Sequence, residues 1–402
     1  MLASLFDFTL HASWLAAWFW LLLLIALVWL RRHGQLNRAH LELILTADQA
    51  DDGGAEMPTL SVLVAAKDEE ANIGRCVESL LAQDYPGLQV VAANDRSQDR
   101  TGAILDELAA RDPRLKVVHI RELPAGWAGK NHAMHQAVQH AAGQVLVFTD
   151  ADCQFHEPRM LRAAVRFAQR EKVDLLSVLP QLEAGTFWER VVQPPAGAIM
   201  VYWFPPQRVN DPASRVAYAN GAFMLMSRES YERLGGHEEA RGALNEDMHF
   251  AATAKRRGLR LRVIRGDGLY TVRMYVGMRQ IWNGWTRIFY CCFGTLGRLM
   301  ASVLFLSIFS LAPTVSLLLS PLAGAAGPAI ALAAAVAVVA QQTVLWRFYA
   351  LGGTPPAWAL TYPLGAAVCL GITLNAMRRH GGATTKWRGT VYSGGGRVAA
   401  AR

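Results

Sequence analysis

The 402-residue sequence has few cysteines, and their spacing excludes two common ways of stabilising a fold. The five cysteines are odd in number and contain no Cys-x-x-Cys pair. Neither a disulfide framework nor a zinc site is therefore indicated. Free thiols are typical of a reducing compartment, so we expect the polar part of the chain to be cytoplasmic. The cysteines are Cys76, Cys153, Cys291, Cys292 and Cys369.

Charged residues are also scarce, at 18% of the chain, whereas 52% of the residues are hydrophobic. Soluble domains carry more charge than this, so the composition predicts membrane segments. The formal net charge of +8 suits an anionic partner such as nucleic acid, anionic lipid or a phosphate-bearing substrate. The basic residues are not gathered into a recognition helix. We therefore expect no nucleic-acid partner.

An uncharged run near the N-terminus predicts a membrane anchor. Residues 13–30 carry no charge and are long enough to cross a bilayer core. Arg31 and Arg32 follow at once, which places this end on the cytoplasmic side. A signal peptide is the alternative, but the segment lacks a basic n-region and an Ala-x-Ala cleavage site. The sequence therefore favours an uncleaved anchor over residues 1–33.

The C-terminal part predicts about three further membrane segments. Leu299–Ser320, Leu322–Val344 and Trp358–Met377 are uncharged and near spanning length, within a predicted membrane region 299–377. Three crossings would put the basic tail, 378–402, outside, whereas the positive-inside rule favours the inside. A re-entrant segment or a different division of the tract would remove the conflict. Before this region, residues 277–298 have the amphipathic aromatic pattern of an interfacial helix.

Between these ends, a polar linker over residues 34–58 precedes an alternation of strand-like and helical segments. This alternation predicts an α/β domain over residues 59–276 with a doubly wound, mostly parallel sheet. No Gly-x-Gly-x-x-Gly follows the first strand, so a dehydrogenase-type dinucleotide fold is not supported. Phe187–Arg208 is rich in aromatics and proline, and we expect it to lie outside regular structure, as core or as a lipid-facing surface. The predicted strands include Leu60–Ala66, Gln89–Ala93, Leu115–Ile120 and Gln144–Thr149.

Two aspartates, Asp150 and Asp152, directly follow a continuous apolar strand. Alone, such a pair is more typical of an Asp-rich turn or a helix cap than of a ligand site. Three further polar stretches lie at strand ends or a helix start, and the carboxyl ends of parallel strands form the ligand crevice of an open sheet. The four together predict a binding site rather than four helix caps. The other three stretches are Lys67–Ile73, Asn94–Thr101 and Asn245–Asp247.

Such a set of groups suits transfer from a nucleotide-linked donor. One carboxylate can accept a hydrogen bond from a base, and Asp150 with Asp152 can hold a hard divalent cation on a diphosphate. A separate carboxylate can deprotonate an acceptor hydroxyl. Lys130 follows a Gly-Trp-Ala-Gly turn, where it can contact phosphate or be a solvated residue at a helix start.

These motifs resemble the family 2 glycosyltransferases, which have the GT-A fold. The resemblance covers residues 60–290. A narrower similarity, to the hopanoid-biosynthesis-associated and carotenoid glycosyltransferases, lies in Leu123–Ala133, in the tail Thr384–Tyr392 and in the four-segment membrane layout. The family-level motifs are Val62–Ile73, Asn94–Asp99, Asp150–Asp152, Asn220–Arg228, Gly235–His237 and Glu246–Asp247.

The resemblance implies a role for each matching residue. Asp95 would pair with uracil, helped by Ala66 and Glu69. Asp150 and Asp152 would serve the ribose, the diphosphate and Mn²⁺ or Mg²⁺. Asp247 would be the general base of a single inverting displacement, with Glu246 beside it. The implied nucleotide-sugar-binding residues are Ala66, Glu69, Asp95, Lys130, Asp150 and Gly221.

The implied activity is that of an inverting hexosyltransferase that moves one sugar from a UDP-sugar to a membrane lipid hydroxyl. The implied location is the bacterial inner membrane, multi-pass, with the catalytic domain cytoplasmic. The Gln-x-x-Arg-Trp motif of processive synthases is absent, and Gln280–Trp285 in the same region has a different spacing. This disfavours a processive polysaccharide synthase. That function, and a non-catalytic nucleotide-sugar-binding membrane protein, are the alternatives.

Overall fold

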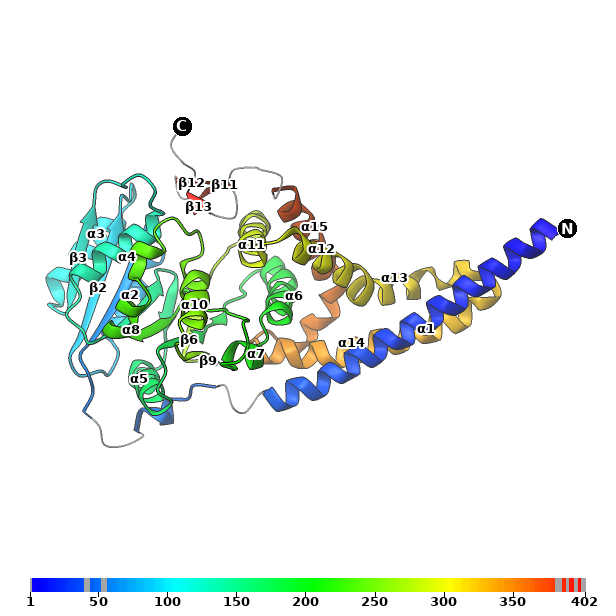
Figure 1. Cartoon of the computed structure of the whole chain (residues 1–402), viewed down its shortest axis with the longest axis horizontal. Helices are drawn as coiled ribbons and strands as arrows, with labels where there is room; N and C mark the ends of the chain where they lie inside the picture. The colour runs from blue at the N-terminus through cyan, green and yellow to red at the C-terminus, as the bar shows by residue number, and fades with distance from the viewer. Residues whose placement is uncertain are drawn as a thin grey trace.

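The computed structural model describes residues 2–39, 44–51, 56–379, 385–387, 390–393 and 397–398. Figure 1 shows an elongated molecule with an α/β domain at one end and a long helical extension at the other. The extension contains α1 (Leu2–Ala39), α13 (Ala312–Leu319) and α14 (Gly327–Leu351). The polar and apolar parts predicted from composition are therefore separated in space.

A seven-stranded sheet forms the centre of the domain, in the order β3-β2-β1-β4-β8-β6-β9. Only β8 runs antiparallel to its neighbours, so the predicted mostly parallel, doubly wound sheet is confirmed. A small second sheet, in the order β5-β10-β7, flanks it. The strands are β1 (Leu60–Ala66), β2 (Leu88–Asp95), β3 (Leu115–Ile120), β4 (Val145–Asp150), β5 (Cys153–Phe155), β6 (Leu175–Leu179), β7 (Gln181–Leu182), β8 (Met224–Ser227), β9 (Leu261–Arg265) and β10 (Tyr270–Val272).

Helices cover both faces of the sheet, which explains why its strands are continuous apolar runs. Leu63 of β1 packs in one core with α4 (Gly129–Gln139) and α10 (Glu246–Arg256). Val62 and Val64 point to the opposite core, because successive strand residues face opposite sides. That core contains α2 (Ile73–Leu81), α3 (Thr101–Arg111) and α5 (Met160–Arg170).

The aromatic segment after β7 is a helix, α6 (Phe187–Trp203), so the expectation of irregular structure was wrong. At its start the Glu189 carboxylate accepts from the Thr186 backbone N–H at 2.9 Å, and Thr-x-x-Glu is a sequence signal for a helix N-terminus. Pro194 and Pro195 lie inside it and remove two backbone donors, which suggested a break. Tertiary packing overrides this cost, since α6 packs against α11 (Met278–Phe293) and α15 (Tyr362–Arg379).

The segment expected as a linker, 34–58, is partly structured. α1 continues through its beginning to Ala39. Ile44 pairs with Arg265 of β9, and a short helix, η1 (Ala47–Asp51), packs on α5. Residues 40–43 and 52–55 of this segment lie outside the described residues. The described parts therefore dock on the domain.

Three apolar helical stretches in the described residues are long enough to cross a bilayer: Ser13–Gly34, Leu296–Leu351 and Pro356–Arg379. The predicted segments 299–320 and 322–344 fall in a single 56-residue stretch. This stretch turns at Gly324, whose φ of 55° and ψ of −130° are not helical. Figure 1 shows α13 leading away from the domain and α14 returning beside α1. The remaining elements of these stretches are α12 (Leu296–Phe305), η2 (Leu306–Leu311), η3 (Ser320–Ala326) and η4 (Pro356–Thr361).

The last long helix, α15, packs on α6, α11 and α12. Its Asn375 donates a hydrogen bond of 3.1 Å to Thr286 of α11. Since the 56-residue stretch runs out and back, and α15 then lies on domain helices, the chain reaches Arg378 on the domain side. Arg388 and Arg402 of the basic tail lie outside the described residues.

A polar network among the apolar helices joins α1, η2 and α14 at one point. η2 is a short π-helix, and Pro313 after it removes the usual donor to the Phe309 carbonyl. That carbonyl accepts instead from Trp29 at 3.0 Å and from Gln341 at 3.1 Å. Gln341 also donates to the Ser310 carbonyl at 3.2 Å. The buried Gln341 amide thus replaces backbone hydrogen bonds lost at the bulge.

We expect Gln341→Leu to lower the stability of the detergent-purified protein by about 1 kcal/mol, because carbonyls in an apolar setting lose their donor. Thermal unfolding followed by tryptophan fluorescence measures the change. Gln342→Leu is the matched control, since this neighbour is only partly buried and makes no hydrogen bond to Phe309 or Ser310. Equal melting temperatures for the two variants would contradict the role of the network.

Candidate active site

A cavity of about 400 Å³ opens at the carboxyl ends of β1, β2 and β4, where the sequence predicts a ligand crevice. Such a volume is in the usual range for small-molecule sites. Residues from the first 70 positions and from beyond position 240 meet in its wall. Every residue predicted for the site lines it: Ala66, Glu69, Asp95, Lys130, Asp150, Asp152, Gly221, Glu246 and Asp247.

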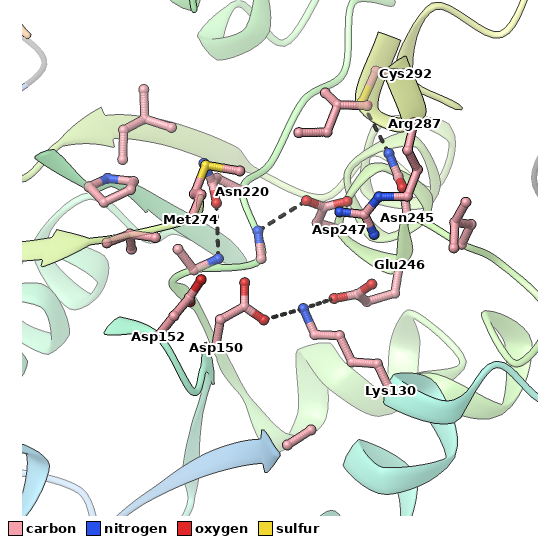
Figure 2. A pocket seen from close by; sticks show the side chains of 18 of the residues that line it. Lys130, Asp150, Asp152, Asn220, Asn245, Glu246, Asp247, Met274, Arg287 and Cys292 are labelled. Atoms are coloured by element: carbon pink, nitrogen blue, oxygen red, sulfur yellow. Dashed lines mark hydrogen bonds and ion pairs between the residues drawn. The ribbon is translucent and has the colours of Figure 1, made fainter. Parts of the chain in front are cut away.

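Lys130, at the start of α4, joins the two sides of the cavity (Figure 2). Its Nζ lies 2.6 Å from Asp150 Oδ1 and 2.6 Å from Glu246 Oε1. Burial alone would lower the pKa of Lys130, but the Asp150 and Glu246 carboxylates outweigh it and raise the pKa above its ordinary value. Lys130 is therefore a fixed cation between two carboxylates rather than a solvated residue at a helix start.

Asp247, in the first turn of α10, is held in place by two backbone amides. Gly221 N donates to Asp247 Oδ2 at 3.0 Å, and Met248 N donates to Oδ1 at 2.7 Å. Burial, followed by the neighbouring Glu246 carboxylate, raises the pKa of Asp247 to about 7. A Cβ at Gly221 would lie 3.0 Å from Lys130 Nζ, so a side chain there would press on this cluster. The raised pKa suits a general base near neutral pH.

Asp152 lies beside Asp150 at the other end of this cluster, as Figure 2 shows. Its Oδ1 is buried and accepts no hydrogen bond from the described residues. Burial, followed by the Asp150 and Glu69 carboxylates, raises the pKa of Asp152 to about 7. An unpaired buried carboxylate oxygen is costly unless a further partner binds it. Asp152 Oδ1 is therefore available to coordinate a bound cation.

Asp95, at the end of β2, is buried and paired with its own neighbour. Arg96 donates from Nε and Nη2 to the two Asp95 oxygens at 2.7 and 2.9 Å. Gly129 allows the carboxylate to lie against the start of α4, because a Cβ there would be 2.7 Å from Asp95 Oδ2. Glu69, close by in the lining, accepts from Asn72 at 2.9 Å. The pairing with Arg96 fixes the direction of the Asp95 oxygens.

The cavity also contains residues that the sequence did not assign to it. Arg287 and Cys292 come from α11, and Figure 2 shows Arg287 extending toward Asp247. Asn131 donates to the carbonyls of Ala240 and Ala243, at 2.5 and 2.9 Å, and so holds the loop that leads into Asp247. The amphipathic pattern of α11 was the only sequence signal for its place in the cavity wall, and the same pattern is typical of a helix at a membrane interface.

Comparison with known proteins fits this geometry. Residues 58–272, more than half of the chain, match the family described as glycosyltransferase like family 2. The chain belongs to glycosyltransferase family 2. The resemblance predicted from the sequence is confirmed, and the protein is a glycosyltransferase of a family that typically inverts the sugar configuration.

Two curated relatives of this glycosyltransferase carry the same name, 4,4'-diaponeurosporenoate glycosyltransferase. That from Staphylococcus aureus strain MRSA252 is 28% identical over 270 residues, covering 65% of this chain and 69% of the relative. That from strain USA300 is 27% identical over the same length. The chain therefore resembles a carotenoid glycosyltransferase, as its motifs predict.

A solved structure confirms the fold of this glycosyltransferase. It is the mannosyltransferase PcManGT from Pyrobaculum calidifontis, in complex with GDP-Man and Mn²⁺. The two chains align with a TM-score of 0.50 and 20% identity, over 90% of this chain and 96% of the other. The predicted GT-A fold is thereby confirmed.

Proposed function

We propose that this glycosyltransferase moves one sugar from a UDP-sugar to the hydroxyl of a membrane lipid, such as a hopanoid or a carotenoid. The observation that carries the proposal is a single cavity that is lined both by acidic groups and by apolar residues of α6 and α11. Both helices pack on α15, within the third apolar stretch. The names of the bacterial relatives support a lipid-like acceptor. We place the catalytic domain at the cytoplasmic face of the inner membrane, because Arg31 and Arg32 follow the first apolar stretch.

On the donor side, the residues present suit a metal-bound diphosphate. Asp150 and Asp152 would hold Mn²⁺ or Mg²⁺, since both ions prefer oxygen ligands and Asp152 Oδ1 is unpaired within the described chain. The described residues contain no group of three or more metal-ligating side chains. Phosphate and water oxygens would complete the set, as is usual for Mg²⁺. When bound, the metal would neutralise charge on the departing diphosphate. Its presence with GDP-Man in the mannosyltransferase structure supports this proposal.

On the acceptor side, Asp247 would take the proton of the lipid hydroxyl. The hydroxyl oxygen would bond to the anomeric carbon as the bond from that carbon to the diphosphate oxygen breaks. The electron pair of that bond leaves with the diphosphate, and the configuration inverts. Lys130 keeps Asp150 and Glu246 at 2.6 Å each, and so fixes the donor side relative to the acceptor side. Asp95, Ala66 and Glu69 would hold the uridine.

The proposal is tested with the full chain in detergent, UDP-sugars and a total bacterial lipid extract. We expect UDP release to require the extract, and the sugar to enter the organic phase. Release at the same rate without lipid would exclude a lipid acceptor. Long sugar chains would favour the processive synthase, and nucleotide-sugar binding without any turnover would favour the non-catalytic alternative.

The activity should rise with pH through about 7. Asp247 accepts a proton only when ionised, and its pKa is raised to about 7. Below that pH the ionised fraction, and with it the transfer rate, falls about tenfold for each pH unit. Saturating Mn²⁺ keeps Asp152 ionised over this pH range. The pH dependence of the transfer rate that remains is then due to Asp247. A rate that stays constant from pH 8 down to pH 5.5 would contradict this assignment.

A further inference from the structure

One face of α6 forms an apolar wall of the cavity. Gly197, Met200, Val201 and Phe204 all line it, and their spacing places them on one side of the helix and its C-cap. Ile288 of α11 lines the same cavity. The contacts of α6 with α15 lie elsewhere on the helix: Cys369 donates to the Val192 carbonyl, and Gly365 lies against Val191 and Pro195. The face of α6 that lines the cavity is therefore separate from the face that holds the helix in the fold.

We propose that this face of α6 is the channel for the apolar part of the acceptor, and that Gly197 sets its width. The inference rests on the proposed function, because it assumes that Asp247 acts on a lipid hydroxyl. It adds the route by which the lipid reaches that carboxylate. It also adds a residue that decides which acceptors fit.

The channel is continuous with the apolar helices. Val201 is 40% exposed, so the apolar face extends from the cavity to the surface of the molecule. Next to it, the ring of Tyr202 stacks on Phe305 of α12, with centroids 4.7 Å apart. Trp203 Nε1 donates to Ser302 of α12 at 2.8 Å. Because α12 begins the stretch Leu296–Leu351, a lipid chain beside it can enter without crossing water.

The space at Gly197 is not needed for packing of the protein. A Cβ at Gly197 would meet no described atom within 4 Å, although the residue lies inside a helix. Glycine weakens a helix interior relative to alanine, so helix stability does not explain its presence. The open volume in front of it belongs to the cavity that contains Asp247. A side chain added there would project into the proposed path of the acceptor.

The test compares Gly197→Ala, Gly197→Phe and the control Gly297→Phe in nanodiscs of total bacterial lipid. Gly297 also lies in a helix and its Cβ would meet no described atom within 4 Å, but it is not part of the cavity lining. Three quantities are measured: transfer of labelled sugar from a UDP-sugar to lipid, UDP affinity by calorimetry, and the melting temperature.

We expect Gly197→Phe to lower transfer about tenfold or more, because the phenylalanine ring would occupy space that the acceptor lipid needs. Gly197→Ala adds only a methyl group and should give a smaller loss. UDP affinity and melting temperature should stay unchanged in both, and Gly297→Phe should transfer like wild type. Wild-type transfer by Gly197→Phe would overturn the channel while leaving the proposed function intact. A loss of UDP affinity equal to the loss of transfer would also overturn it. Absence of lipid transfer by the wild type would instead contradict the proposed function.

Discussion

Asp247→Asn should lower sugar transfer by about 10²- to 10⁴-fold, the range for loss of a general base. The amide is nearly isosteric with the carboxylate and its oxygen can still accept from Gly221 N or Met248 N, so α10 should keep its position. The amide cannot take the acceptor proton. Initial rates of transfer at saturating donor, with binding of UDP measured separately, give the effect on the chemical step.

The matched control for this change is Asp106→Asn. Asp106 is another helical aspartate, but its side chain is 60% exposed and lies outside the cavity lining. We expect wild-type transfer from the control. Undiminished transfer by Asp247→Asn would show that Asp247 is not the general base. An equal loss of transfer in Asp247→Asn and Asp106→Asn would indicate a general effect of the lost negative charge.

Removal of divalent metal should have the second large effect, a loss of transfer of about 100-fold or more, because the departing diphosphate then lacks its main charge stabiliser. Dialysis against a chelator, followed by titration with Mn²⁺ or Mg²⁺, measures the loss and its recovery. In Asp152→Asn, we expect recovery to need a much higher metal concentration, since a neutral amide binds a hard cation less well than a carboxylate.

Thermal unfolding is the control for metal removal, because it separates a loss of transfer from a loss of folded protein. Asp150 is already paired with Lys130 at 2.6 Å, so the fold does not depend on a cation at this position. Chelation should therefore leave the protein folded at the assay temperature while transfer falls, and the melting temperature should drop only by the contribution of the bound metal. Full transfer in the chelator would exclude the metal role of Asp150 and Asp152.

The sheet and the position of the site could be predicted because each depends on local sequence. β1 and β4 are buried on both faces, so they appear as unbroken apolar runs. The chain turns polar where such strands end, and Asp95 and Asp150 mark those ends directly. Parallel pairing then brings the ends together at one edge of the sheet.

The parts that could not be predicted depend on contacts between distant segments. The prolines of α6 indicate a break, and only packing on α11 and α15 keeps the helix continuous. The bridge from Lys130 to Glu246 joins residues more than a hundred positions apart, so no local pattern indicates it. The amphipathic pattern of α11 fits a membrane surface equally well, although Arg287 contributes to the cavity wall.

The most direct test of the central claim is the mass spectrum of the organic-phase product made by the full chain from a UDP-sugar and total bacterial lipid. We expect a lipid that carries one added sugar and that is absent when Asp247→Asn replaces the wild type. A ladder of products with several sugars, or sugar found only in the aqueous phase while UDP is released, would contradict transfer of a single sugar to a membrane lipid.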